Sequence, residues 1–234
     1  RLEKQLKSFY NTQIVLSHGD IAIDSHRHIT IYKNSKNIKR EVLINNPTGA
    51  ALKYFLYGEI PIIAQSVMVR KSVMNKIGGF KQIPNLYLVD YPTWMEIALY
   101  GKFAFIPEVL GYWRRHSDSI TSMYQQQLWQ GTLDYIDQFV QKHKDELNRL
   151  PVNLDHYMKY PGAYALSALY KVSLLNGNRM KARNYLYEIW RKRKGCELKE
   201  LLKVCLLSPF VFVPYLFFFY KKYIDIKTRK FAPH

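Results

Sequence analysis

The chain has 234 residues, 48% of them hydrophobic and 15% aromatic, and this amount of apolar surface excludes an intrinsically disordered protein. The formal charge of +17 predicts a polyanionic partner, which would be nucleic acid, an anionic membrane surface or a phosphorylated substrate. The two cysteines, Cys196 and Cys205, have neither redox nor metal-ligand spacing, which argues against a disulfide scaffold and a structural zinc site.

The first half of the chain alternates predicted helices and strands. In chain order, we expect a helix at Leu2–Phe9, a strand at Gln13–Ser17, a turn at His18–Asp20, an extended stretch at Ile21–Ile23 and a polar loop at Asn34–Arg40. Then follow a helix from Asn46 to Tyr57, a strand at Pro61–Val69, helices at Arg70–Ile77 and Pro92–Tyr100, and strands at Phe103–Ile106 and Val109–Trp113 around Pro107. Gly58 and Gly78 end two of these helices, because glycine tolerates the left-handed backbone of a helix C-cap. The predicted fold class is α/β.

From Met123 onward the pattern changes to longer segments of helical period, broken by prolines and glycines. We expect a boundary near Ser122, with residues 1–122 as the α/β part, 123–200 as a region of three or four helices, and 201–234 as an apolar and basic tail. Residues 204–220 of the tail are nearly all apolar, contain two prolines and have lysines and arginines on both sides. A segment lying in the plane of an anionic membrane fits this pattern best, and a buried helix pair or a membrane span are the alternatives.

A series of short motifs runs from Ala64 to Thr121. It consists of QSVMVRK at 65–71, IGGF at 77–80, VDYPTW at 89–94, IPEVLGYWRRH at 106–116 and SIT at 119–121. This series resembles the second half of the family 2 inverting glycosyltransferases, which have the GT-A fold, and the resemblance covers residues 1 to about 121. The Asp-x-Asp metal-binding motif of that family is missing. We therefore expect the chain to be the C-terminal part of a catalytic domain, without the nucleotide-binding half, and to be inactive by itself.

The resemblance assigns the catalytic base to Asp90. Inverting transfer requires a base that takes the proton of the acceptor hydroxyl as its oxygen attacks the anomeric carbon, and a carboxylate can do this. Asp90 lies at the start of a predicted helix, whose dipole favours the ionised form, and a plain helix-capping role is the alternative. The family usually has Glu before this Asp, whereas this chain has Val89, which keeps a noncatalytic glycosyltransferase-like scaffold open.

Three residues at the end of the closing motif match the donor side of the family's site. His116 corresponds to a metal ligand, which implies Mg²⁺ or Mn²⁺ as cofactor, with a hydrogen bond to a loop or phosphate as its alternative role. Arg114 and Arg115 are expected to bind the donor diphosphate through their planar guanidinium groups, and surface exposure is their alternative.

Gln65, Ser66 and Trp94 are expected to contact the acceptor, although a tryptophan on a helix is more often part of the core. The histidines and aspartates between His18 and His28, including Asp20 and Asp24, are interpreted as a solvated loop and not as a metal site.

The resemblance implies a hexosyltransferase-type enzyme that uses a nucleotide-sugar donor and a glycan or lipid-linked acceptor in bacterial surface polysaccharide synthesis, such as capsule or O-antigen. The basic and apolar tail predicts peripheral attachment to the cytoplasmic face of the inner (plasma) membrane. A nucleic-acid-binding protein is the alternative from another class. The chain has no RNP-like, KH-like or zinc-finger pattern, and its basic residues lie beside the apolar run, so we expect no nucleic-acid partner.

Overall fold

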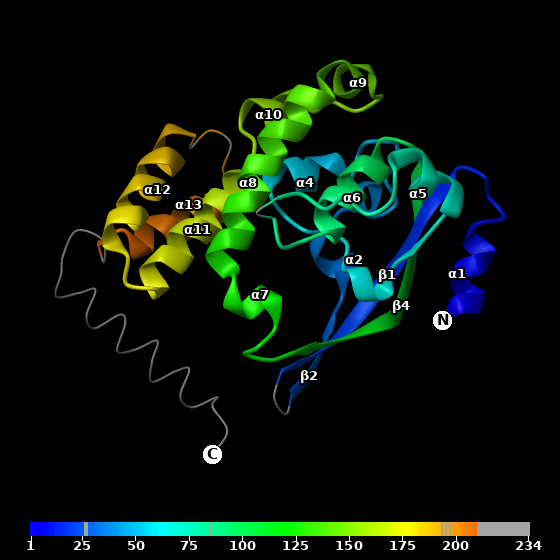
Figure 1. Cartoon of the computed structure of the whole chain (residues 1–234), viewed down its shortest axis with the longest axis horizontal. Coiled ribbons are helices and arrows are strands. Elements are labelled where there is room, and N and C mark those ends of the chain that lie inside the picture. The colour runs from blue at the N-terminus through cyan, green and yellow to red at the C-terminus, as the bar shows by residue number, and fades with distance from the viewer. Residues whose placement is uncertain (26–27, 85, 193, 195, 197, 210–234) are drawn as a thin grey trace.

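The computed structural model describes residues 1–25, 28–84, 86–192, 194, 196 and 198–209. Within them a mixed four-stranded sheet is combined with many helices, so the α/β fold class is confirmed at this level. In Figure 1 the sheet and α1 lie at one end of the molecule, α11, α12 and α13 gather at the other end, and α8 runs between them.

The helices and strands have the following bounds. In the first half they are α1 (Leu2–Ser8), β1 (Ile14–Ser25), β2 (His28–Tyr32), α2 (Asn34–Asn37), α3 (Arg40–Leu43), α4 (Leu52–Tyr57), the 3₁₀ helix η1 (Ala64–Ser66), β3 (Met68–Val69), α5 (Lys71–Ile77), α6 (Asp90–Ala98) and β4 (Lys102–Arg115). In the second half they are α7 (Ile120–Met123), α8 (Gln125–Lys142), α9 (Lys144–Arg149), α10 (Asp155–Lys159), α11 (Ala163–Leu175), α12 (Arg179–Arg191) and α13 (Leu198–Leu207).

Strand β1 is the centre of the sheet, since it pairs with each of the other three strands. β4 runs parallel to β1 and pairs with it along residues 14–25 of β1. β3 and β2 run antiparallel along the other edge of β1. β3 pairs with Leu16 and Ser17, and β2 pairs with residues 21–25. The turn predicted at His18–Asp20 is therefore wrong. Gly19 serves close packing instead of a turn, because a Cβ atom there would lie 2.6 Å from the carbonyl oxygen of Ile106.

The two strands predicted around Pro107 form the single strand β4. Gly19 is paired with Ile106 and Asp20 with Val109, so Pro107 and Glu108 lie in a bulge between paired positions. A bulge accommodates proline because no ladder hydrogen bond is needed from its nitrogen. The break in the hydrophobic pattern was real, but it interrupts the pairing and not the strand.

The helices that end at glycine are confirmed. Gly58 and Gly78 follow α4 and α5 with φ of 96° and 79°, in the left-handed region. The strand predicted at Pro61–Val69 is largely wrong. Only Met68 and Val69 form a strand, β3, and Ala64–Ser66 form the 3₁₀ helix η1. The predicted loop at Asn34–Arg40 contains α2.

Helix α1 forms as predicted, but its buried side is polar. Leu2 and Leu6 are 64% and 57% exposed, whereas Gln5 is fully buried. The Gln5 side-chain amide donates hydrogen bonds to the carbonyl oxygens of Ser17 (3.2 Å) and Ser66 (2.9 Å). These bonds fix which side of α1 faces β1, and the apolar residues are left on the outside.

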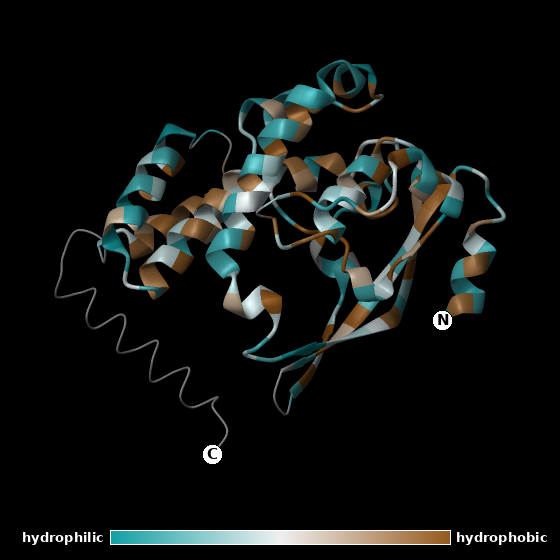
Figure 2. Ribbon diagram, viewed as in Figure 1, coloured by the Kyte–Doolittle hydropathy of each residue, from teal (hydrophilic) through white to brown (hydrophobic). Residues whose placement is uncertain are grey.

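The larger hydrophobic core continues past Ser122. Phe55, Tyr91 and Phe103 from the α/β part pack in one cluster with Ile136 and Phe139 of α8. A second cluster joins α11, α12 and α13, and Figure 2 colours most of α11 as hydrophobic. The described residues beyond Met123 form six helices, α8 to α13, where three or four were predicted.

Most of the predicted tail, residues 210–234, lies outside the described residues. Among the helices that the structure describes, none is long and apolar enough to cross a membrane.

Candidate functional site

Asp90 is the first residue of α6, directly after the N-cap residue Val89. Its carboxylate is partly buried and accepts a hydrogen bond from the backbone N–H of Tyr91 at 2.9 Å. Burial raises the pKa of Asp90, and hydrogen bonds from the backbone N–H groups of Tyr91 and of Asp90 itself offset part of this effect. A carboxylate in this setting is a stronger base than an exposed one.

The first turn of α6 is anchored on both sides. The Tyr91 hydroxyl donates to the carbonyl oxygen of Phe55 in α4, and the two rings meet edge to face at 5.6 Å. Thr93 is buried, donates to the carbonyl oxygen of Val89 and accepts a 2.9 Å hydrogen bond from the backbone N–H of Lys81. The segment from Lys81 to Val89 is thus tied to α6 at both of its ends.

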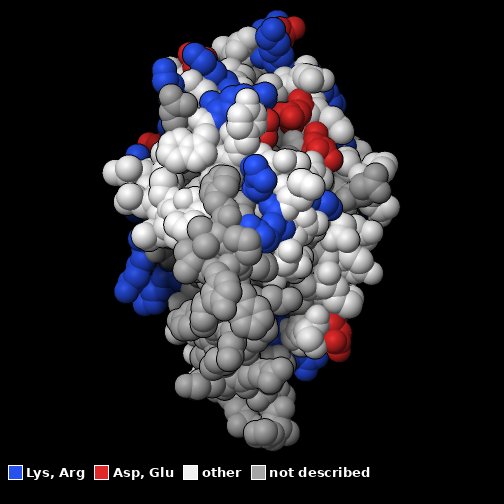
Figure 3. Space-filling model, turned by 90° about the vertical axis from the view of Figure 1, so that its left-hand side faces the viewer, with Lys and Arg blue, Asp and Glu red and all other residues white. Residues whose placement is uncertain are grey.

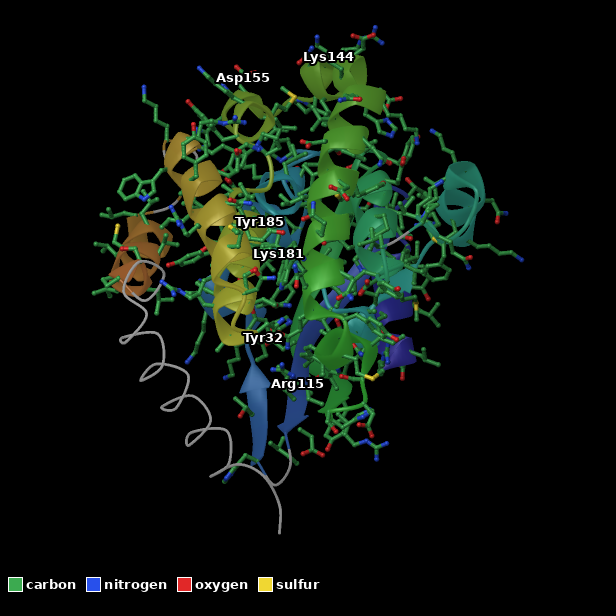
Figure 4. The ribbon with its side chains drawn as sticks, turned by 60° about the vertical axis from the view of Figure 1, so that its left-hand side comes forward. Tyr32, Arg115, Lys144, Asp155, Lys181 and Tyr185 are labelled. Atoms are coloured by element: carbon green, nitrogen blue, oxygen red, sulfur yellow. The ribbon has the colours of Figure 1, made fainter. Side chains whose placement is uncertain are left out.

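Strand β4 delivers the cationic residues. Arg114 and Arg115 are its last two residues, paired with Asp24 and Ser25 of β1, and His116 follows directly. All three side chains are exposed, and the Arg115 guanidinium lies 5.2 Å from the centroid of the Trp113 ring. Figure 4 labels Arg115 beside the strands, in the lower half of the view.

Serine hydroxyls fix the turn that follows β4. The Ser119 and Ser122 hydroxyls both donate to the carbonyl oxygen of His116, at 2.9 and 3.0 Å. The turn holds the backbone of His116 through these two bonds. It leads directly into α7 and to Tyr124, which separates α7 from α8.

An aromatic stack joins the segments of the two principal predicted residues. Tyr87, three residues before Asp90, stacks on Tyr124, eight residues after His116, with 4.6 Å between ring centroids and 9° between planes. The loop that leads to Asp90 therefore lies against the turn that follows His116. The contact joins the two segments through Tyr87 and Tyr124 and not through Asp90 and His116 themselves.

The three residues predicted to contact an acceptor have different positions. Gln65 in η1 is exposed and lies against β4, because a Cβ atom at Gly111 would be 2.5 Å from the Gln65 carbonyl oxygen. Ser66 is fully buried, and its hydroxyl donates to the carbonyl oxygen of Ile63 at 3.0 Å. Trp94 is 3% exposed and packs edge to face on Phe80 at 6.2 Å. Ser66 and Trp94 thus contact the protein's own interior, as the core alternative for Trp94 anticipated, and only Gln65 presents its side chain to solvent.

No group of three or more histidine, cysteine, aspartate or glutamate side chains in the described residues is arranged to hold a metal ion. The carboxylates expected to share a metal with His116 belong to a motif that the sequence does not contain.

The interpretation of His18 and Asp20 as parts of a solvated loop is wrong. Both are buried in β1: the Asp20 carboxylate accepts a 2.8 Å hydrogen bond from the backbone N–H of Asn34, and His18 Nε2 lies 2.7 Å from the carbonyl oxygen of Leu43. Burial lowers the pKa of His18 to about 4, although the Leu43 hydrogen bond acts in the opposite direction. His18 Nδ1 and the Ser17 hydroxyl have no hydrogen-bond partner in the described part of the chain. Residues 14–21 of β1 are all buried, so this part of the strand has no period-two alternation of buried and exposed residues that could have revealed it.

A second polar cluster links α6 to the end of α8. Glu96 and His143 are both nearly fully buried; Glu96 is bound by Lys142 at 2.8 Å and lies 3.2 Å from His143, and Glu146 contacts the other ring nitrogen of His143. Burial raises the pKa of Glu96, but the Lys142 hydrogen bond and the nearby His143 outweigh it and lower the pKa overall. The cluster fastens helices that are distant in sequence, and nothing in the sequence pattern pointed to it.

A pocket of about 230 Å³ lies between α4, α10 and the segment before α13, away from the predicted site residues. It is lined by Lys53, Tyr54, Tyr57, Glu59, His156, Tyr157, Lys194 and Cys196. Lys53 pairs with Glu41 at 3.1 Å, and the His156 ring contacts Tyr157 edge to face at 5.4 Å. The pocket has both signs of charge and does not select a ligand class.

Comparison of the chain with protein-family models, with curated proteins and with solved structures gave no match in any of the three.

Proposed function

We propose that this chain supplies the acceptor side of an inverting glycosyltransferase site, in which Asp90 is the general base. The observation that carries the proposal is the carboxylate of Asp90, which is partly buried at the first turn of α6. The loop that precedes it stacks through Tyr87 on Tyr124, in the segment after His116. The ordered motif series from Gln65 to Thr121 is the sequence support for it.

The proposed reaction follows from these groups. The Asp90 carboxylate takes the proton of an acceptor hydroxyl while the hydroxyl oxygen forms a bond to the anomeric carbon of the donor sugar. The bond from that carbon to the diphosphate breaks on the opposite face, and the nucleoside diphosphate leaves with the electron pair. Arg114 and Arg115 are then the groups that offset the charge on the departing diphosphate.

In the same proposal, His116 is a ligand of a divalent cation, Mg²⁺ or Mn²⁺, which would supply further charge neutralisation at the diphosphate. The exposed imidazole just beyond β4 is compatible with this role. The acceptor is a glycan or lipid-linked hydroxyl at a membrane surface, in surface polysaccharide synthesis, and Gln65 is the exposed candidate for contacting it.

A noncatalytic scaffold is the second candidate, because an apolar residue, Val89, stands beside Asp90 and is 43% exposed. Sugar transfer by the full-length gene product, assayed with a panel of nucleotide sugars and Mg²⁺ or Mn²⁺, separates the two. A catalytic protein transfers or hydrolyses at least one donor and loses turnover with His116→Ala or Asp90→Asn. A folded full-length protein that turns over none of the donors favours the scaffold.

Asp155→Asn is the matched control for Asp90→Asn. Asp155 is also the first residue of its helix, α10, and carries no proposed role. Figure 4 labels Asp155 near the top of the view and Arg115 in its lower half, well apart from each other. The Asp155→Asn variant is expected to keep wild-type turnover.

A further inference from the structure

Within the part of the chain that the structure describes, helix α13 packs against other helices on one side. Val204 is buried, and the partly buried Leu201 and Leu207 pack with it against residues of α11 and α12, among them Tyr170 and Leu186. These contacts account for one apolar face of α13.

The opposite face is also apolar. Leu198, Leu202 and Leu206 are 72%, 56% and 74% exposed, and their spacing of four residues aligns them along one side of the helix. Helices that are apolar on more than one side are normally buried. A cluster of exposed leucines therefore marks a surface that binds another protein, a ligand or a membrane. We call Leu198, Leu202 and Leu206 the outer face of α13.

The sequence that carries the outer face is positively charged, which indicates the kind of partner. Residues 179–207 contain nine lysines and arginines and three glutamates, a net charge of +6. Figure 3 looks at this end of the molecule and shows groups of basic side chains beside uncharged surface. Tyr187 and Trp190 of α12 are also exposed. The leucines can enter the apolar layer of a bilayer, the aromatic side chains suit its interface, and the positive charge attracts anionic headgroups. Together these features match the surface of an anionic lipid bilayer.

We propose that the outer face of α13 docks on anionic membranes, with the helix lying in the plane of the bilayer and its three leucines in the headgroup region. A folded surface patch, and not only the part of the apolar run that continues beyond α13 in the sequence, then holds the protein at the membrane. The inference is independent of the proposed transferase activity, because its test measures lipid binding alone.

The test is cosedimentation of the chain with vesicles of phosphatidylcholine, with and without 30% phosphatidylglycerol. The wild-type chain is expected to bind vesicles that contain phosphatidylglycerol more tightly than vesicles of phosphatidylcholine alone. This binding is expected to weaken as the salt concentration is raised. The variant Leu202→Ser with Leu206→Ser is expected to bind them at least about tenfold more weakly, which corresponds to about 1.4 kcal/mol.

The matched control is Leu2→Ser with Leu6→Ser, a pair with the same spacing and similar exposure on α1. It is expected to bind like wild type. Equal binding by the α13 variant and wild type would overturn the proposal and assign membrane binding to another segment. A change from dimer to monomer in the α13 variant, without a change in vesicle binding, would show instead that a second copy covers this face.

Cys205 gives a second measurement that does not depend on substituting the leucines. It is exposed on α13 between Leu202 and Leu206. With Cys196 replaced by Ser, a polarity-sensitive fluorophore on Cys205 should shift its emission to the blue when phosphatidylglycerol vesicles are added. An unchanged emission with bound vesicles would contradict docking through this face.

Discussion

Acidification is expected to destabilise the fold through His18. The folded protein holds this imidazole neutral, since burial lowers its pKa from 6.5 to about 4. Between these two values the unfolded chain binds a proton that the folded chain does not, so the contribution of His18 to stability is complete above pH 6.5 and is lost as the pH falls toward 4. At pH 4.5 the loss in the free energy of unfolding amounts to about 2.5 kcal/mol.

The variant His18→Phe removes the titrating group and keeps an aromatic ring beside Phe103 and Phe105. It loses the hydrogen bond to Leu43, which costs about 1 kcal/mol at every pH. Urea unfolding at pH 7.5 and 4.5 gives the free energies of unfolding. We expect wild type to lose roughly 2–3 kcal/mol more than His18→Phe on acidification.

The control is His28→Gln, which changes an exposed histidine of the neighbouring strand β2 and should leave the acid sensitivity of wild type in place. If His18→Phe loses as much stability on acidification as wild type does, the burial of a neutral His18 is not the cause and the reasoning is refuted.

Two further predictions concern the contacts around the site. Gly111→Ala places a Cβ atom 2.5 Å from the Gln65 carbonyl oxygen. Because this carbonyl group belongs to the backbone and cannot turn away as a side chain could, we expect a loss of about 1–3 kcal/mol in the free energy of unfolding, seen as a lower Tm. An unchanged Tm would contradict the close approach of η1 and β4. Tyr124→Ala removes the stack on Tyr87, at a cost of about 0.5–1.5 kcal/mol, and should speed amide hydrogen exchange at residues 81–89, whereas Tyr124→Phe should not. Equal exchange in both variants would mean that the stack does not hold the loop.

The parts of the fold that could be predicted are those whose signal is local. The helix ends at Gly58 and Gly78 could be predicted because each depends only on the backbone conformation of one residue. The parts that were wrong depend on distant partners. Gly19 and Asp20 resemble a turn until β4 is placed beside them, and Gln5 is buried because of two carbonyl oxygens that only the folded chain brings together.

The same distinction applies to the candidate site. The sequence motifs identified Asp90 at a helix start and Arg114 to His116 at a strand end, and both positions are confirmed. The Tyr87–Tyr124 stack could not be foreseen, since nothing in either segment specifies its partner. For Ser66 and Trp94, residue type alone did not distinguish a ligand contact from a buried position, and the structure places both in the interior.

The central claim, that Asp90 is a general base, is tested most directly by the pH dependence of sugar transfer in the full-length protein with and without Asp90→Asn. Asp90 must be ionised to accept a proton, and burial raises its pKa. As the pH is lowered, the wild-type rate should therefore begin to fall at a higher pH than it would with an ordinary carboxyl group as the base. The Asp90→Asn variant should be about 10²- to 10⁴-fold slower while Asp155→Asn remains like wild type. A folded Asp90→Asn protein with the wild-type rate and pH profile would show that Asp90 only supports the start of α6.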